Sequence, residues 1–153
     1  MANDALAVAA RKAIHDPAFV STPHCCQMFV REVIEAVYGD RYDDYRADTA
    51  LHAAQKWQAA GLGKKVEDIS DYPQTGDILY KMFNDGDAGH VGIYVGRIGD
   101  PQPVIGLVAE NSSTSIGRVQ GAKGYRNLSE FGAVDLVVRL PDPSPTANSP
   151  VGG

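Results

Sequence analysis

Two cysteines and four histidines are the residues of this chain whose types favour nucleophilic chemistry. The thiols, Cys25 and Cys26, are adjacent, and the histidines are His15, His24, His52 and His90. A cysteine nucleophile needs a base within hydrogen-bond reach, and the base needs a third group that orients it. His90 differs from the other histidines because it opens an apolar run directly after the loop sequence Asp-Gly-Asp-Ala-Gly. Its ring is therefore expected to project from the end of a strand toward a helix.

The other three histidines are weaker candidates for a base. His15 follows a predicted helix and His52 lies within another, so both are expected to be surface or packing residues. His24 is only two residues from Cys26, which is too close for the two side chains to face each other from one helical turn. His90 is therefore the predicted base.

The thiols begin a stretch, Pro23 to Tyr38, that is predicted to form an amphipathic helix. Apolar residues recur on one stripe at helical spacing, and these are Cys26, Phe29, Val30, Val33, Ile34 and Val37. Ser21 or Thr22 can cap the helix and Pro23 suits its first position, which places Cys26 in the first turn. The N–H groups of a first turn lack intrahelical partners, so they stabilise a thiolate and can hold an oxyanion. The same stripe also accommodates Cys26 as a small buried hydrophobe.

Length, composition and charge predict one soluble globular domain. The chain has 153 residues, of which 44% are hydrophobic and 22% charged, and its formal net charge is -5. It has no run of basic residues, which excludes the electrostatic footprint of a nucleic-acid binder. The start of the chain lacks the pattern of a signal peptide or membrane span, so synthesis in the cytoplasm is expected. Adjacent cysteines predict reduced thiols.

The pattern along the chain predicts helices first and strands afterwards. The expected helices cover 3–14, capped by Asn3 or Asp4, then 23–38, ended by Gly39, and a third from a cap at Asp48 to residue 60, ended by Gly61 and Gly63. The expected strands cover 77–83, 90–95, 104–110 and 134–139, and 112–131 is predicted to be a long loop with one helical turn. This order indicates an α+β fold with helices packed on an antiparallel sheet. Residues 1–140 are predicted to form a single domain and 141–153 a disordered tail.

Three motifs occur in a fixed order: Cys26-x-x-Phe29-Val30, Gly76-Asp77-Ile78-Leu79-Tyr80 and Gly89-His90-Val91-Gly92-Ile93-Tyr94-Val95-Gly96. Together they resemble the papain-like cell-wall hydrolases of the NlpC type and the related CHAP amidases, over roughly residues 20–112. The resemblance implies a papain-like fold, with Cys26 as nucleophile and His90 as general base. Glu110 falls where family members carry the residue that orients the histidine. Asn111 is the alternative, because strand alternation lets only one of the two face His90.

The chain also departs from the family pattern. Cys25 stands where NlpC-type members usually have Asp and CHAP members Gln, and the upstream segment rich in Tyr and Gly is replaced by Phe19–His24. These differences concern the oxyanion and substrate environment. Asp77 is expected to start a strand and to be structural.

The resemblance implies a cysteine peptidase or amidase that cleaves amide bonds of bacterial peptidoglycan, with the stem peptide as substrate and no metal or cofactor. A monomeric phage lysin would have this activity, as would an interbacterial toxin of the same class. Either would act at the cell wall after release or export. A non-catalytic papain-fold binding or structural module, with Cys26 inert, is the alternative. A metal site formed by His24, Cys25, Cys26 and His90 is less favoured, because adjacent thiols on a helix point about 100° apart.

Overall fold

The computed structural model describes residues 3–21, 25–82, 89–96, 106–111, 116–120 and 122–143, with the side chains of 116–120 excepted. Its helices are α1 (Asp4–His15), α2 (Cys26–Tyr38), α3 (Ala50–Ala59) and α4 (Leu128–Phe131), with short 3-10 turns at Asp43–Tyr45 and Val66–Asp68. Its strands are β1 (Gly63–Lys65), β2 (Ile78–Lys81), β3 (His90–Gly96), β4 (Leu107–Asn111), β5 (Ile116–Gln120), β6 (Lys123–Asn127) and β7 (Leu136–Val138). The expected α+β class is confirmed.

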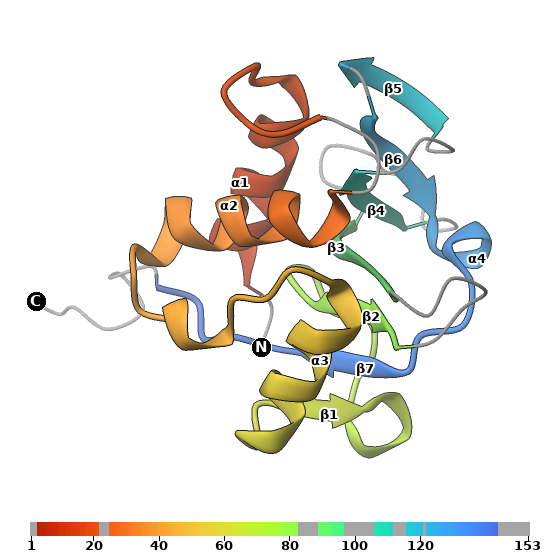
Figure 1. The fold of residues 1–153 in the computed structure, drawn as a ribbon. Helices are drawn as coiled ribbons and strands as arrows, with labels where there is room; N and C mark the ends of the chain where they lie inside the picture. Colours follow the sequence, from red (N-terminus) through yellow and green to blue (C-terminus); the bar gives the residue numbers. More distant parts are fainter. Residues whose placement is uncertain are drawn as a thin grey trace, which may run out of the picture.

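The strands of the described residues form one antiparallel sheet in the order β1-β7-β2-β3-β4-β6-β5. Helices α1 and α2 pack against the central strands β3 and β4, and α3 packs against β1, β2 and β7 (Figure 1). Strand alternation gives the sheet two apolar faces. The helix-covered face contributes Tyr80, Ile93 and Ala109 to the main core, whereas Leu79 and Val108 pack with α4 on the other face.

Local capping explains where the helices begin and end. The Asn3 side chain accepts a hydrogen bond from the Leu6 N–H at 3.2 Å, which confirms the predicted cap of α1. Gly39 ends α2 with a φ of 65°, in the left-handed region that favours glycine. The predicted cap of α3 is wrong by one residue, because Thr49 Oγ1 accepts from the His52 N–H at 3.1 Å. Asp48 and Thr49 are both good capping residues, so the sequence could not separate them.

The largest correction concerns residues 112–131, which were predicted to be a long loop with one helical turn; α4 agrees with that turn, but the strands were not predicted. The described part of this segment forms β5, β6 and α4. Strand β6 pairs with β4 from Leu107↔Asn127 to Asn111↔Lys123, although its sequence, Lys-Gly-Tyr-Arg-Asn, has no β-branched residue. Strand pairing is made by backbone groups, so an available sheet edge can order a segment whose side chains do not predict a strand.

Strand β1 was also missed. Gly63 was predicted to end a helix but it lies in β1, opposite Val138. A Cβ atom at Gly63 would lie 2.7 Å from Leu136 Cδ2, so this strand packs closely only because residue 63 is glycine.

Several predicted boundaries shift by a few residues. Strand β2 ends at Lys81 and β7 covers 136–138, so both are shorter than predicted. Helix α2 begins at Cys26 with Cys25 as N-cap, so Ser21 is not its cap, and the predictions for Thr22 and Pro23 lie outside the described residues. Residues 22–24, 83 and 104–105, which the predictions also included, lie outside the described residues.

The ends of the described chain lie together. Asn3 Nδ2 donates to the Leu140 carbonyl at 3.0 Å, and the Tyr38 hydroxyl donates to the Pro141 carbonyl at 2.6 Å. The main core includes both Leu6 and Leu140. The domain boundary at 140 stays a prediction, and the predicted disordered tail falls outside the described residues from 144 onward. Among the helices of the described residues, none is long and apolar enough to cross a membrane.

Candidate active site

Cys26 is the first residue of α2, as expected of a thiol in a helical first turn. Both cysteines are free and half-buried, and Cys26 packs against the main core. The Cys25 carbonyl accepts the hydrogen bond of the Phe29 N–H at 3.0 Å, which closes the first turn of the helix. The N–H groups ahead of Phe29 have no intrahelical partner, so they carry the positive end of the helix dipole beside the Cys26 thiol.

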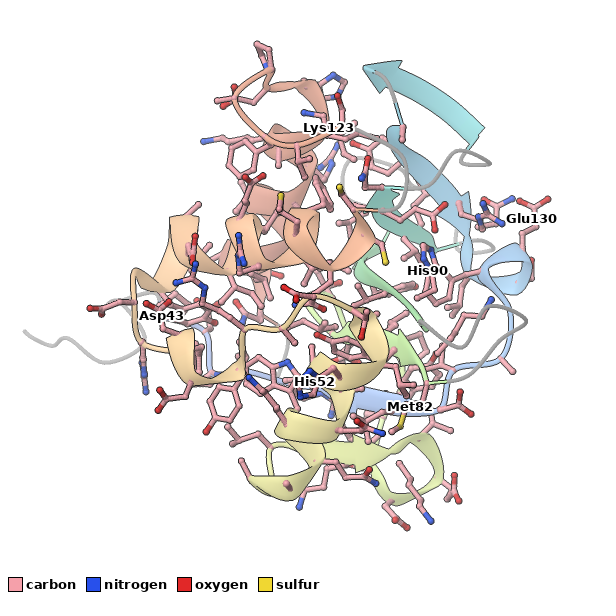
Figure 2. The ribbon with its side chains drawn as sticks, viewed as in Figure 1. Asp43, His52, Met82, His90, Lys123 and Glu130 are labelled. Carbon is pink, nitrogen blue, oxygen red and sulfur yellow. The ribbon has the colours of Figure 1, made fainter. Side chains whose placement is uncertain are left out.

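His90 is the first residue of β3 and is paired with Glu110 of β4. Its Nε2 lies 2.7 Å from Glu110 Oε1, and the Glu110 side chain is fully buried. An ionised carboxylate only accepts hydrogen bonds, so Nε2–H is the donor. Gly92 is opposite Glu110 in the sheet, which puts Glu110 diagonally across from His90 on one face. Figure 2 shows His90 at the end of its strand.

The register therefore distinguishes the two predicted orienting residues. Glu110 contacts His90, whereas Asn111, one residue further along β4, points to the other face. Both side chains are buried. Of the two alternatives left open by the sequence, the structure brings Glu110 to the histidine.

The surroundings of His90 favour its protonated form. Burial alone would lower the pKa of His90, but hydrogen bonds and negative charge from Cys26 and Glu110 outweigh this effect and raise the pKa to about 9. Since Nε2 is engaged by Glu110, Nδ1 is the ring nitrogen available to Cys26. The arrangement can hold a proton on His90 at neutral pH, beside the Cys26 sulfur.

Arg126 is part of the site although the sequence did not point to it. Its Nε donates to Glu110 Oε2 at 2.9 Å, so the two oxygens of the buried carboxylate face His90 and Arg126 respectively. Arg126 is opposite Val108 in β6 and so shares a sheet face with Glu110. No sequence signal could have found it, because β6 itself was not predicted.

Phe131 of α4 was also missed as a site residue, because the helical turn predicted within 112–131 could not be placed against His90 from the sequence. Its ring lies 5.4 Å from the His90 ring between centroids, at an interplanar angle of 33°, and it is almost fully buried. Lys81 Nζ donates to the Phe131 carbonyl at 2.8 Å and so ties α4 to the end of β2. Phe131 therefore shields one face of the imidazole from water.

The segment that leads from α1 toward Cys26 is anchored at several points. The fully buried Lys123 donates from Nζ to the carbonyls of three residues, Ala13 at 2.8 Å, Asp16 at 2.5 Å and Phe19 at 3.1 Å. Figure 2 shows Lys123 between this segment and β6. The Ser21 carbonyl accepts from the Ala122 N–H at 2.8 Å, and Val20 N–H donates to Glu32 of α2 at 2.8 Å. These contacts fix the chain segment that leads into α2.

The remaining candidates lie elsewhere or outside the described residues. His15 and His52 are exposed, as expected, and His24 falls outside the described ranges. Asp77 is fully buried and pairs with Arg139, whose Nε lies 2.8 Å from Oδ1, which agrees with a structural role. Within the ranges that the structure describes, no group of three or more His, Cys, Asp or Glu side chains could hold a metal ion.

Comparison of the chain with protein-family models, with curated proteins and with solved structures finds no match. Inference about its function therefore depends on the three sequence motifs and on the contacts made by Cys26, His90 and Glu110.

Proposed function

We propose that this protein is a cysteine hydrolase that cleaves amide bonds, with a papain-like arrangement of Cys26, His90 and Glu110. The observation that carries the proposal is the buried Glu110 carboxylate on His90 Nε2, at 2.7 Å, with Cys26 contributing to the raised pKa of the same ring. A buried charged pair is expensive unless its members are well partnered, and at such a site it supports a chemical role.

The residues have distinct roles in the proposed reaction. His90 takes the proton of Cys26, and the thiolate attacks the carbonyl carbon of the scissile amide. The N–H groups of the first turn of α2 bind the resulting oxyanion. Protonated His90 then donates its proton to the leaving amine, which leaves a thioester on Cys26. Water, deprotonated by His90, hydrolyses the thioester and restores the thiol.

Glu110 orients the ring of His90 and stabilises its positive charge without itself taking the proton. Arg126 holds the second oxygen of Glu110 and so restricts rotation of the carboxylate. In the proposed mechanism the catalytic groups are side chains and backbone N–H groups of the protein, and water is the second nucleophile.

The proposed substrate class is the stem peptide of bacterial peptidoglycan. This part of the proposal rests on the resemblance of the three motifs to NlpC-type and CHAP hydrolases. A net charge of -5 gives no long-range attraction to an anionic wall, so the substrate must be recognised by contact. Action at the cell wall after release or export, as a phage lysin or an interbacterial toxin, fits this chemistry.

A non-catalytic binding or structural module is the second candidate. The observation in its favour is that Cys26 is half-buried and packs against the main core, as an inert thiol would. A non-catalytic module does not explain why the partnered Glu110 carboxylate lies beside His90, so the hydrolase is preferred.

The test is release of soluble fragments from purified peptidoglycan by the unmodified protein, by Cys26→Ala and by Cys25→Ala. We expect the Cys26→Ala protein to lose activity and the Cys25→Ala protein to keep it, because only Cys26 is assigned as nucleophile. Mass analysis of the new termini identifies the bond that is cut. Equal activity of all three proteins would exclude a thiol mechanism. Inactivity of the folded, unmodified protein on walls of several chemistries would favour the binding module.

A further inference from the structure

Gln27 is the buried polar side chain in the first turn of α2, directly after Cys26. Its neighbours in that turn are more open, since Cys26 is half-buried and Met28 is 40% exposed, whereas Gln27 is 4% exposed. The apolar residues that hold the rest of the helix against the core begin only at Phe29. Gln27 is therefore the polar side chain that attaches this first turn to the interior, next to Cys26, which packs against the main core.

Two hydrogen bonds in series tie Gln27 to two other elements. The Tyr80 hydroxyl of β2 donates to Gln27 Oε1 at 2.9 Å, and Trp57 Nε1 of α3 donates to the Tyr80 hydroxyl oxygen at 3.2 Å. Tyr80 is fully buried and Trp57 nearly so. Burial raises the pKa of Tyr80 well above its ordinary value, and the charge of Cys26 acts in the same direction. Tyr80 therefore keeps the proton that it donates to Gln27.

Besides Gln27 and the packing of Cys26 on the core, the start of α2 has little support from side chains. Its N-cap residue, Cys25, makes no capping hydrogen bond through its side chain, and the first turn contains no acidic residue. Adjacent residues of a helix point about 100° apart, so a fixed rotation of Gln27 also fixes the direction of Cys26. A nucleophile must be held to within about half an ångström of its productive position, which requires such supporting contacts.

We propose that Gln27 is a positioning residue, held by Tyr80 and through it by Trp57, which sets the direction in which the Cys26 thiol meets His90. The inference rests on the proposed function and deepens it, because it adds a residue outside the group formed by Cys26, His90 and Glu110. Gln27 affects the proposed reaction only by positioning Cys26.

The experiment measures alkylation of Cys26 by iodoacetamide as a function of pH, in a Cys25→Ala background that leaves a single thiol. Gln27→Met keeps the side-chain length and removes the acceptor oxygen. We expect its alkylation at mildly acidic pH to be about ten- to a hundredfold slower, because a small misplacement of a reacting group has an effect of this size. The pH profile is expected to move to higher pH. Tyr80→Phe, which deletes one oxygen atom, should move it in the same direction and provides the test if Gln27→Met does not fold.

Val33→Ala is the matched control, because Val33 is fully buried on the same helix and lies outside the hydrogen-bonded chain. It should lower the melting temperature without moving the pH profile. An unchanged profile in both Gln27→Met and Tyr80→Phe would overturn the inference, as would an equal shift in Val33→Ala at the same loss of melting temperature. Failure of the proposed function is distinct: the thiol of the parent protein would then react no faster than the thiol of a short peptide.

Discussion

Glu110 is a carboxylate without access to solvent, and its two oxygens accept hydrogen bonds from His90 and Arg126. A buried carboxylate loses several kcal/mol of hydration, which only close partners of opposite charge can offset. The cationic form of His90 is one such partner, so Glu110, together with Cys26, raises the pKa of His90 despite burial of its ring. At the scale of residues, the protonation of His90 and the ionisation of Glu110 depend on each other.

Replacement of Glu110 by Gln tests this dependence. The amide retains an acceptor for His90 but removes the negative charge, so the pKa of His90 should fall from about 9 toward its ordinary value of 6.5. We expect alkylation of Cys26 near neutral pH, measured in the Cys25→Ala background, to slow by about 10- to 100-fold, the lower part of the range for loss of acid–base assistance.

Asn111→Ala is the comparison for this prediction, because Asn111 is the neighbouring buried polar residue on the other face of β4. Its effect on alkylation should be much smaller than that of Glu110→Gln. An equal or larger effect would assign the orienting role to Asn111 instead.

At the scale of elements, the site depends on how α1, α2 and β6 are joined. Strand β6 supplies Arg126 to one sheet face and Lys123 to the other, where Lys123 holds the end of α1 and the following segment. Burial lowers the pKa of Lys123, and the nearby charges of Asp16 and Glu32 oppose this effect. The three carbonyls that Lys123 satisfies belong to residues 13, 16 and 19, where the chain leaves α1.

Lys123→Met is expected to lower the free energy of unfolding by about 2 kcal/mol. Methionine fills the volume of the lysine stem but removes the donor to the Phe19 carbonyl, whereas the carbonyls of Ala13 and Asp16 each keep a backbone N–H donor. A buried group left without its partner costs about 1–3 kcal/mol. Urea denaturation followed by circular dichroism measures the change. Lys12→Met on the exposed face of α1 is the matched control and should change stability by less than about 0.5 kcal/mol. Equal effects of the two substitutions would show that Lys123 does not anchor the segment.

For the whole molecule, the proton on His90 links the site to global stability. The pKa of His90 is about 9 in the folded chain, against an ordinary value of 6.5, so the folded state binds this proton more tightly than the unfolded state. The resulting stabilisation is complete below pH 6.5 and is lost as the pH rises through about 9. Its size is on the order of 1–3 kcal/mol, from the shift of the pKa and the remaining exposure of the ring.

The free energy of unfolding should therefore decrease across this pH range, and urea denaturation at several pH values measures it. His90→Gln lacks the titrating ring, so its stability should decline less steeply with pH. Parallel curves for the parent and the variant would contradict the raised pKa of His90.

The amino-acid sequence by itself was sufficient for the features that depend on neighbours along the chain. The helical stripe from Cys26 to Ile34 predicted α2 and placed the thiol in its first turn, because helix periodicity and capping are local properties. The apolar runs around Leu79 and Ile93 predicted β2 and β3 for the same reason. Helices followed by short strands also predicted the α+β class.

Only the tertiary structure decided which polar groups meet. The register of β3 against β4 selects Glu110 over Asn111, and an unpredicted strand brings Arg126 to Glu110 and Lys123 to the end of α1. The hydrogen bond between Gln27 and Tyr80 joins residues 53 positions apart. Such contacts have no periodic signature, because they depend on register and on the packing of distant elements, which only the folded chain defines.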